Sequence, residues 1–577
     1  MMPIPRSSTS SAHPALIALC ASLAVGFLQP APAADAADHA AGSAMSPFGI
    51  GSDAANNRSV AAYAGWVPKI AAIGIKRHRT VETSWGALEK VEGQWTWGEL
   101  DQQMKYLDEQ GIAYGAILYG SGRKDRGGTL PVNGLADWSH YVSELASHVK
   151  GRVTYFEVWN EPPNGTGRNQ TAADYAKVVA SAYDATHAVD PTNKLGITAK
   201  SVHINYLDQA IAGEAKDHFD WISLHPYEVL NGIADNIGTE SIYMHIVPIV
   251  RKMLAARDPA KIDVPIIFTE LGTDARKGAD NQGQTLIKAY AMGIAQGVAC
   301  IEWFEARDGD SGPMGLLDGK GNPRPSYNAM AHLIEHLGQH PIYLGWVLLN
   351  DRDCGFVFHG AKGTVLATWA PKGSPDHVDF GTSVSIVDPL TGAATDAAAY
   401  DLTVAPILVL KVPEALVQRA QSNRTKPFPW GGDYSDAKSV SITMGERNIE
   451  KGLHTHSGAS IAKAVLLYGG SARAGNVPGG NVFVVDPNFL SYTTVPIEIR
   501  MVVRRNPDNK PARITLEYES TSGYKKLAPF DIPESSEWST ATWSIDDDQF
   551  VNMWAYNFTV TSGSYLIQSV TVTKTSK

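Results

Sequence analysis

At 577 residues the chain is longer than one ordinary domain, and a hydrophobic content of 44% is enough to bury several cores, which excludes a disordered protein. A net charge of −10 without any basic run makes the chain a poor candidate for binding nucleic acid or an anionic membrane. Neither CxxC nor HExxH occurs, so no motif predicts a metal site and we expect no cofactor.

The N-terminal segment 1–33 has the organisation of an export signal. Arg6 precedes an apolar stretch from Ala15 to Leu28, and Ala31-Pro32-Ala33 supplies the small residues of a cleavage site. We expect this segment to be removed and the protein to be secreted or periplasmic. Loss of Arg6 changes the net charge from −10 to −11. No later run approaches the roughly 18–20 apolar residues of a membrane helix.

Removal of the signal leaves two cysteines, Cys300 and Cys354. Two cysteines of an exported protein could form a disulfide. Cys300 lies in a predicted buried strand, however, and two inert buried thiols agree with the sequence equally well.

From Ser46 to about His336, predicted strands alternate with predicted helices. The strands are expected at Phe48–Gly51, Gly74–Arg79, Ala113–Tyr119, Val153–Trp159, Leu195–Thr198, Trp221–Leu224, Ile266–Glu270 and Ala299–Phe304. Between them, Leu100, Met104 and Leu107 recur at helical spacing, and Thr171 opens another helix with a capping signature. Eight such units predict a single (β/α)8 TIM barrel over residues 46–338.

The pattern changes after the barrel. Short β-rich runs separated by Gly and Pro predict a small β-domain over 339–413, and the Pro- and Gly-rich stretch 414–434 is typical of a linker. Alternating apolar residues then predict an all-β sandwich, jelly-roll-like, over 435–577. We expect this last domain to be a separate binding module; the alternative is a packing domain that stabilises the barrel.

Two glutamates stand where predicted barrel strands end. Trp159-Asn160-Glu161-Pro162 ends the apolar run Val153 to Val158, and Thr269-Glu270-Leu271-Gly272 ends the run Val264 to Phe268. The C-terminal ends of the strands build the active site of a TIM barrel, so both carboxylates would face one pocket. One protonated and one ionised carboxyl group are the equipment of glycosidic bond cleavage.

Trp159 to Pro162 and Thr269-Glu270 resemble the signature of the clan A retaining glycoside hydrolases. Within that clan the chain resembles family 39 most, and family 5 next. The further similar segments are Lys76 to Arg79, Trp85, Glu92 to Trp97, Gly315 to Asp318 and Pro323 to Pro325. The resemblance covers the predicted barrel and implies an eight-fold barrel enzyme that cleaves glycosidic bonds.

The resemblance implies that Glu161 is the general acid/base and Glu270 the nucleophile. Glu161 has to hold a proton near neutral pH, while Glu270 has to stay ionised. In a retaining site the two carboxyl groups lie roughly 5–5.5 Å apart, so ionised Glu270 would raise the pKa of Glu161.

The same resemblance implies a set of substrate-binding residues around the two glutamates. Asn160 would bind the sugar 2-hydroxyl, His225 would line the sugar site, and Tyr227 would donate to Glu270. Arg79 would keep Glu270 ionised through a charge-assisted hydrogen bond. Trp303 would offer a platform for a pyranose face, and Trp159 completes the set.

Each of these residues also has a purely structural interpretation. Glu157, Glu302 and Glu305 lie on or near barrel strands and compete with the two candidates; Glu157 lies four residues deeper than Glu161 and suits a buried partner for a basic side chain. Trp303 could be core, and His225 a satisfied structural histidine. Arg77 and His78 compete with Arg79 for the inward position, because a slip of one residue changes the face.

We therefore predict a retaining β-glycosidase that acts by double displacement on an extracellular or cell-surface polysaccharide or oligosaccharide. With such a substrate, we expect the sandwich 435–577 to be a carbohydrate-binding module. Two alternatives stay open. One is a non-catalytic polysaccharide-binding protein on the same barrel, and the other is a transglycosylase that uses the same glutamates.

Overall fold

The structure is a computed structural model that describes residues 45–52, 59–80, 83–120, 129–163, 170–371, 375–429, 432–455, 461–463, 469–535 and 537–575. The predicted export signal 1–33 lies outside the described residues. These residues belong to one compact unit.

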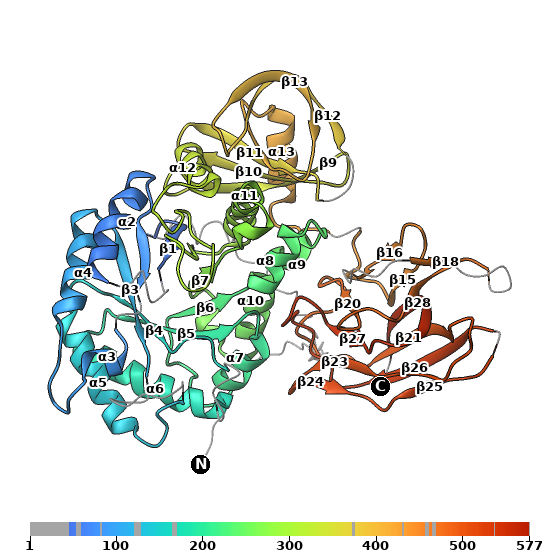
Figure 1. The fold of residues 1–577 in the computed structure, drawn as a ribbon, viewed down its shortest axis with the longest axis horizontal. Helices are drawn as coiled ribbons and strands as arrows, with labels where there is room; N and C mark the ends of the chain where they lie inside the picture. The colour runs from blue at the N-terminus through green and yellow to red at the C-terminus, as the bar shows by residue number, and fades with distance from the viewer. Residues whose placement is uncertain are drawn as a thin grey trace, which may run out of the picture. The chain divides into compact units, whose positions relative to one another are not determined.

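Eight parallel strands close a barrel in the order β1 to β8, as predicted (Figure 1). The strands are β1 Phe48–Gly51, β2 Arg77–Thr80, β3 Ala113–Leu118, β4 Tyr155–Val158, β5 Lys194–Lys200, β6 Trp221–His225, β7 Ile266–Leu271 and β8 Cys300–Trp303. Each overlaps its predicted strand. The fold is therefore a TIM barrel.

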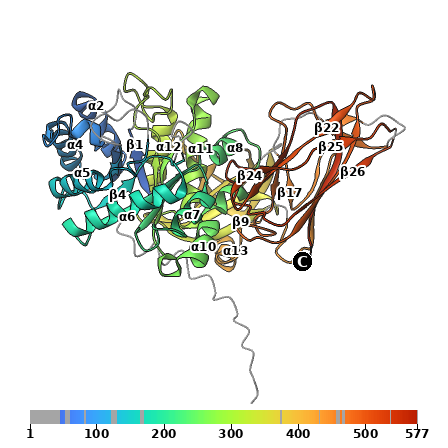
Figure 2. The same ribbon diagram turned by 90° about the horizontal axis from the view of Figure 1, so that it is seen from below.

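Helices lie outside the strands, and Figure 2 shows α2, α4, α5 and α6 on the outer side of β1 and β4. The helices of the barrel are α2 Val60–Ala72, α3 Trp85–Leu88, α4 Gly98–Glu109, α5 Leu135–His148, α6 Ala172–Val189, α7 Ile204–Ile211, α8 Tyr227–Ala234, α9 Glu240–Met244, α10 Ile246–Arg257, α11 Ala279–Gln296 and α12 Pro325–Leu337, with the 3-10 turns η2 Pro259–Lys261 and η3 Ala275–Lys277. The predicted cap is present, since Thr171 accepts a hydrogen bond from the Asp174 amide.

The alternation along β2 decides which basic residues face the barrel interior. Arg77 pairs with Glu302 and Arg79 with Glu157, so both arginines point inward. His78 points the other way, and its ring packs against Tyr63 and Trp66 of α2. Arg77 and Arg79 therefore occupy successive inward positions, one deeper and one nearer the C-terminal end of β2.

The β-domain is a six-stranded antiparallel sheet in the order β13-β12-β14-β11-β10-β9. Its strands are β9 Ile342–Leu349, β10 Asp353–Gly360, β11 Gly363–Trp369, β12 Asp376–Val387, β13 Ala394–Leu402 and β14 Ile407–Leu410. The linker prediction for 414–434 is wrong for its first half, because Glu414–Asn423 forms helix α13. Ala420 of α13 is buried in the core of this sheet, and Gly345 on β9 provides the space.

The C-terminal domain is the predicted β-sandwich. Its larger sheets are built on β16-β15-β28-β19-β18, with β21 and β26 attached, and on β17-β20-β27-β23-β24. The strands are β15 Ser439–Thr443, β16 Ile449–Lys451, β17 Leu453–His454, β18 Ile461–Lys463, β19 Ser471–Ala474, β20 Asn481–Val485, β21 Ile497–Arg505, β22 Ala512–Ile514, β23 Leu516–Ser520, β24 Gly523–Lys526, β25 Phe530–Ile532, β26 Ser539–Ile545, β27 Phe558–Val560 and β28 Tyr565–Lys574. The alternating residues Ile497, Ile499, Met501 and Val503 are buried in its core.

Buried contacts join the sandwich to the barrel. Tyr492 and Val551 belong to the same apolar cluster as the barrel core, and the Tyr492 hydroxyl donates to the buried Asp208 of α7. Asn205 of α7 donates to the Ser520 carbonyl at 3.2 Å. These contacts support the alternative of a domain that packs on the barrel, and they contradict a module held only by a flexible linker.

Cys300 and Cys354 are both free and buried. Within the described ranges, none of the helices is both long enough and apolar enough to cross a bilayer.

Candidate active site

Glu161 and Glu270 lie together at the C-terminal end of the barrel. Glu161 follows β4, and Glu270 lies near the end of β7 at an irregularity of the pairing with β8. One oxygen of each carboxylate and a ring nitrogen of His225 all lie within 4.8 Å of one another. The two side chains keep 17% and 12% of their surface exposed, so both reach the opening of the barrel.

The backbone that presents Glu161 has an uncommon conformation. Trp159 has φ 71° and Glu161 has φ 51°, in the left-handed region that residues other than glycine seldom adopt. Each such residue costs on the order of 1–3 kcal/mol, and strain of this kind gathers at functional sites.

Arg79 connects three acceptors. Its Nε donates to Glu157 at 2.9 Å, its Nη1 donates to Glu270, and its Nη2 donates to Asn160 Oδ1 at 2.8 Å. The side chain is almost fully buried, so these charge-assisted bonds form away from bulk water. Arg79 thereby fixes the position of Glu270 relative to Asn160.

A second donor reaches the other oxygen of Glu270, because the Tyr227 hydroxyl lies 3.3 Å from Oε2. His225 is fully buried between the two glutamates: its Nδ1 lies 3.0 Å from Glu161 Oε1 and 3.6 Å from Glu270 Oε2. The sequence-predicted Arg79, Asn160, His225 and Tyr227 thus all gather around the two carboxylates.

Thr269 is a connecting residue that the sequence analysis did not single out. Its hydroxyl lies 2.9 Å from His225 Nε2 and donates to Glu157 Oε1 at 3.0 Å. Because the hydroxyl proton goes to Glu157, the Thr269 oxygen accepts from Nε2–H of His225. The proton shared by His225 Nδ1 and Glu161 is then the one that can move from one group to the other. Thr269 has the same inward parity as Ile267, a signal that could have found it.

The surroundings of Glu161 correct the expectation of a raised pKa. Burial on its own raises the pKa of Glu161, but the hydrogen bond from His225 and the charges of His225, Lys200 and Arg79 outweigh burial and lower it. Burial likewise disfavours charged His225, but Glu270 and Glu161 outweigh it and raise the pKa of His225. The two pKa values are thus shifted in opposite directions, which favours a proton on His225 over one on Glu161 in the free site.

The competing carboxylates are engaged elsewhere. Glu157 is buried and held by Arg79, as its depth on β4 suggested; burial alone raises its pKa, but the Arg79 charge outweighs burial and lowers it. Glu302 is buried against Arg77 at 2.6 Å, and buried Glu305 accepts from the Gly309 amide. All three are buried, whereas Glu161 and Glu270 are partly exposed.

The two predicted tryptophans do not face the site. Trp303 is 0% exposed. It points to the outside of the barrel, like Ile301 two residues earlier on the same strand, which packs on α11. Trp159 is 1% exposed and packs against Tyr119 and Trp138. Neither ring offers a face to a sugar, so the expectation that Trp159 and Trp303 bind substrate is wrong. Both rings pack among other buried side chains instead. Phe304, with inward parity, lies edge-on to Tyr227 with ring centroids 6.3 Å apart, and Tyr227 donates to Glu270.

Among the residues that the structure describes, Glu161, His225 and Glu270 form a group whose ligand atoms could hold a metal ion. The guanidinium of Arg79 donates directly to Glu270, however, and His225 has a raised pKa. A cation would have to compete with both positive charges, so the donor set fits proton transfer better than metal binding.

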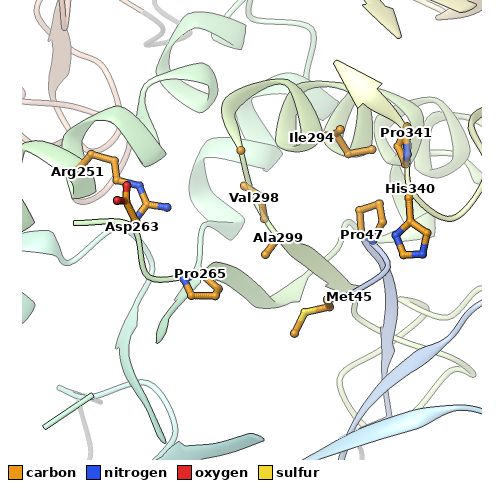
Figure 3. Close-up of a pocket in the computed structure, with 11 residues that line it drawn as sticks. Met45, Pro47, Arg251, Asp263, Pro265, Ile294, Val298, Ala299, His340 and Pro341 are labelled. Atoms are coloured by element: carbon orange, nitrogen blue, oxygen red, sulfur yellow. The ribbon is translucent and has the colours of Figure 1, made fainter. Parts of the chain in front are cut away.

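A hollow of about 80 Å³ lies at the other end of the barrel, and Figure 3 shows the residues that line it. Pro47, Pro265 and Ala299 line it, and each precedes the first residue of β1, β7 or β8. The hollow therefore lies at the N-terminal ends of the strands, where a TIM barrel carries stability rather than catalysis.

The described residues thus form an eight-fold barrel with a closely spaced carboxylate pair at the catalytic end. No protein-family model matches the chain, and no curated protein matches it either. Several solved structures are similar to it at low identity.

A family 39 glycoside hydrolase from the gut symbiont Bacteroides cellulosilyticus WH2 is 18% identical, with a TM-score of 0.49 over 63% of this chain and 80% of that chain. A glucosidase from Croceicoccus marinus is 12% identical, with a TM-score of 0.43 over 92% and 96%. The catalytic domain of GH30 xylanase C from Talaromyces cellulolyticus is 11% identical, with a TM-score of 0.45 over 63% and 96%. Function has to be inferred from the residues of the site.

Proposed function

We propose that the protein is a retaining β-glycosidase in which Glu161 is the general acid/base and Glu270 the nucleophile. The observation that carries the proposal is the placement of the two carboxylates at the ends of β4 and β7, with oxygens within 4.8 Å. Retaining enzymes hold their carboxyl groups roughly 5–5.5 Å apart, whereas inverting enzymes need roughly 6.5–9.5 Å to admit a water.

In the first step Glu270 attacks the anomeric carbon while Glu161 protonates the glycosidic oxygen, and the bond between that carbon and that oxygen breaks. The proton comes from the pair of Glu161 and His225, which lie 3.0 Å apart. When a substrate excludes water from the site, a neutral pair costs less than an ion pair, so the proton moves to Glu161.

In the second step Glu161, now ionised, removes a proton from water, and the hydroxide attacks the anomeric carbon. The bond to Glu270 breaks and its carboxylate is restored. Arg79 and Tyr227 stabilise that carboxylate when it leaves, because both donate to it in the free site.

Asn160 has its carbonyl oxygen directed to Arg79, so a sugar meets its amide N–H2 group. This group suits donation to a ring hydroxyl next to the anomeric carbon. The sequence analysis expected Trp303 to provide the apolar surface for the sugar. We assign that role to Phe304 instead, whose ring lies edge-on to Tyr227.

Hydrolysis of a panel of β-linked oligosaccharides, followed by NMR of the first-formed product, tests the proposal. We expect retained anomeric configuration; an inverted product would falsify the role of Glu270.

Variants test the two roles separately. Glu270→Gly should abolish turnover of natural substrate and form the α-glycosyl azide when azide is added. Glu161→Ala should keep activity on substrates with activated leaving groups and form the β-azide. Glu157→Gln is the matched control: if it behaves as we expect of Glu161→Ala, the assignment of the acid is wrong.

The hydrolysis assay on the wild-type protein separates the two alternatives. A non-catalytic binding protein would show no turnover on any glycan, and a transglycosylase would transfer the glycosyl group to sugar rather than water. We further propose export through the segment 1–33, which N-terminal sequencing of the mature protein checks.

A further inference from the structure

A loop of the C-terminal sandwich reaches residues beside the acid/base. The Ser201 hydroxyl lies 2.9 Å from the Met553 carbonyl, and Ser201 forms a β-bridge with His225, the residue that contacts both glutamates. Trp554 follows Met553 directly. The sandwich is therefore connected to the catalytic pair through two short contacts.

Trp554 packs against two residues of the barrel at this position. Its ring lies edge-on to His203, with centroids 4.8 Å apart, and the Lys200 ammonium lies 5.8 Å from its centroid. The Lys200 amide donates to the Pro162 carbonyl at 3.2 Å, and Pro162 follows Glu161. Trp554 is only half-buried, so part of its surface remains accessible.

The loop that carries Trp554 is held in place from within the sandwich. The buried carboxylate of Glu519 accepts hydrogen bonds from the amides of Val551, Asn552 and Met553. Asn552 and Ala555 adopt positive φ angles of 60° and 62°. A strained loop fixed by a buried carboxylate presents Trp554 in one orientation, which is the condition for a binding surface.

We propose that Trp554 and Lys200 form the leaving-group side of the active site, where Trp554 stacks on the sugar ring that departs from the cleaved bond. The proposal rests on the proposed function. The acid must touch the glycosidic oxygen, so the leaving sugar lies on the Glu161 side, and Lys200 lies on that side because its amide donates to the carbonyl of Pro162, the residue after Glu161. The substrate class is a glycan with a further sugar beyond the cleaved bond.

The test compares two leaving groups on full-length protein. Hydrolysis of β-1,4-linked disaccharides of xylose, mannose and glucose is measured beside that of the corresponding β-glycosyl fluorides, which have no leaving ring to stack. For Trp554→Ala we expect a loss of roughly tenfold in kcat/KM on the best disaccharide and unchanged kcat/KM on its fluoride. Trp554→Phe should recover most of the loss.

Trp538→Ala is the matched control, since Trp538 packs on Arg504 within the sandwich and should leave both substrates unaffected. Equal losses on disaccharide and fluoride, or no loss on either, would overturn the proposal. If instead the Glu270→Gly variant hydrolysed the fluoride as fast as the wild-type protein does, that result would contradict the proposed function.

Discussion

The interior of the barrel holds two arginines of the same strand, and only one of them contacts a partly exposed glutamate. Arg77, the deeper one, pairs with Glu302, and its guanidinium packs on the Tyr155 ring at 4.8 Å. Arg79, one inward position further along β2, holds Glu157 and in addition Glu270. Both layers pair an arginine with a buried glutamate. We call the layer of Arg77 the lower layer and the layer of Arg79 the upper layer. Only the upper layer lies at the opening of the barrel, so only there is a carboxylate left partly exposed for chemistry.

We expect the largest effect from Arg79→Met. The substitution leaves Glu157 buried without its cation and removes the strongest donor to Glu270. kcat/KM should fall by roughly 10²–10³, and the free energy of unfolding should fall by about 3 kcal/mol. Steady-state kinetics and urea denaturation measure the two effects. An active, merely less stable variant would show that the two layers do not differ in function.

Arg77→Met should destabilise the protein by a similar amount, about 3–5 kcal/mol, because Glu302 is left buried and unpaired. The kcat of the folded fraction should stay unchanged. The double variant Arg77→Met/Glu302→Met, which removes both charges, should recover much of the stability. If kcat falls as far as in Arg79→Met, the lower layer is part of the catalytic machinery and the comparison fails.

The pH dependence of the activity tests which group carries the proton shared by His225 and Glu161. The pKa of His225 is raised and that of Glu161 lowered, so the pair loses its proton as the pH rises through the folded pKa of His225. Activity should therefore fall along an alkaline limb centred above pH 6.5, the ordinary value for histidine, and the stability that His225 contributes should be lost over the same range. His225→Gln should move that limb to lower pH. An unmoved limb would show that another group supplies the proton.

Thr269→Val should have the smallest effect, since Thr269 acts through its neighbours His225, Glu157 and Ser223, whose Oγ lies 2.5 Å from the Thr269 hydroxyl. Removal of the hydroxyl leaves His225 Nε2 without its acceptor, so kcat should fall about tenfold and the alkaline limb should shift. Thr269→Ser keeps the hydroxyl and should restore both values. If the serine variant behaves like the valine variant, packing of the methyl group, not the hydrogen bond, explains the effect.

Strand positions and the two glutamates could be predicted from the sequence because both are local signals: an apolar run fixes a strand, and its end places Glu161 or Glu270 at the opening. The roles of Trp159 and Trp303 could not, since one residue of register decides between core and site. The shared proton of Glu161 depends on His225 and Lys200 from two other strands. Trp554 comes from another domain, so no spacing within the barrel could indicate it. Helix α13 was missed because a helix of ten residues surrounded by Pro, Gly and polar residues resembles a linker.

The most direct test of the double displacement is to trap its covalent intermediate. A 2-deoxy-2-fluoro-β-glycoside with a dinitrophenolate leaving group slows the second step more than the first, so the glycosyl-enzyme accumulates. Mass spectrometry of the intact and digested protein should show one added fluorosugar, on the peptide that contains Glu270. Turnover without any trapped sugar, or a label on the peptide that contains Glu157 and Glu161, would contradict the account.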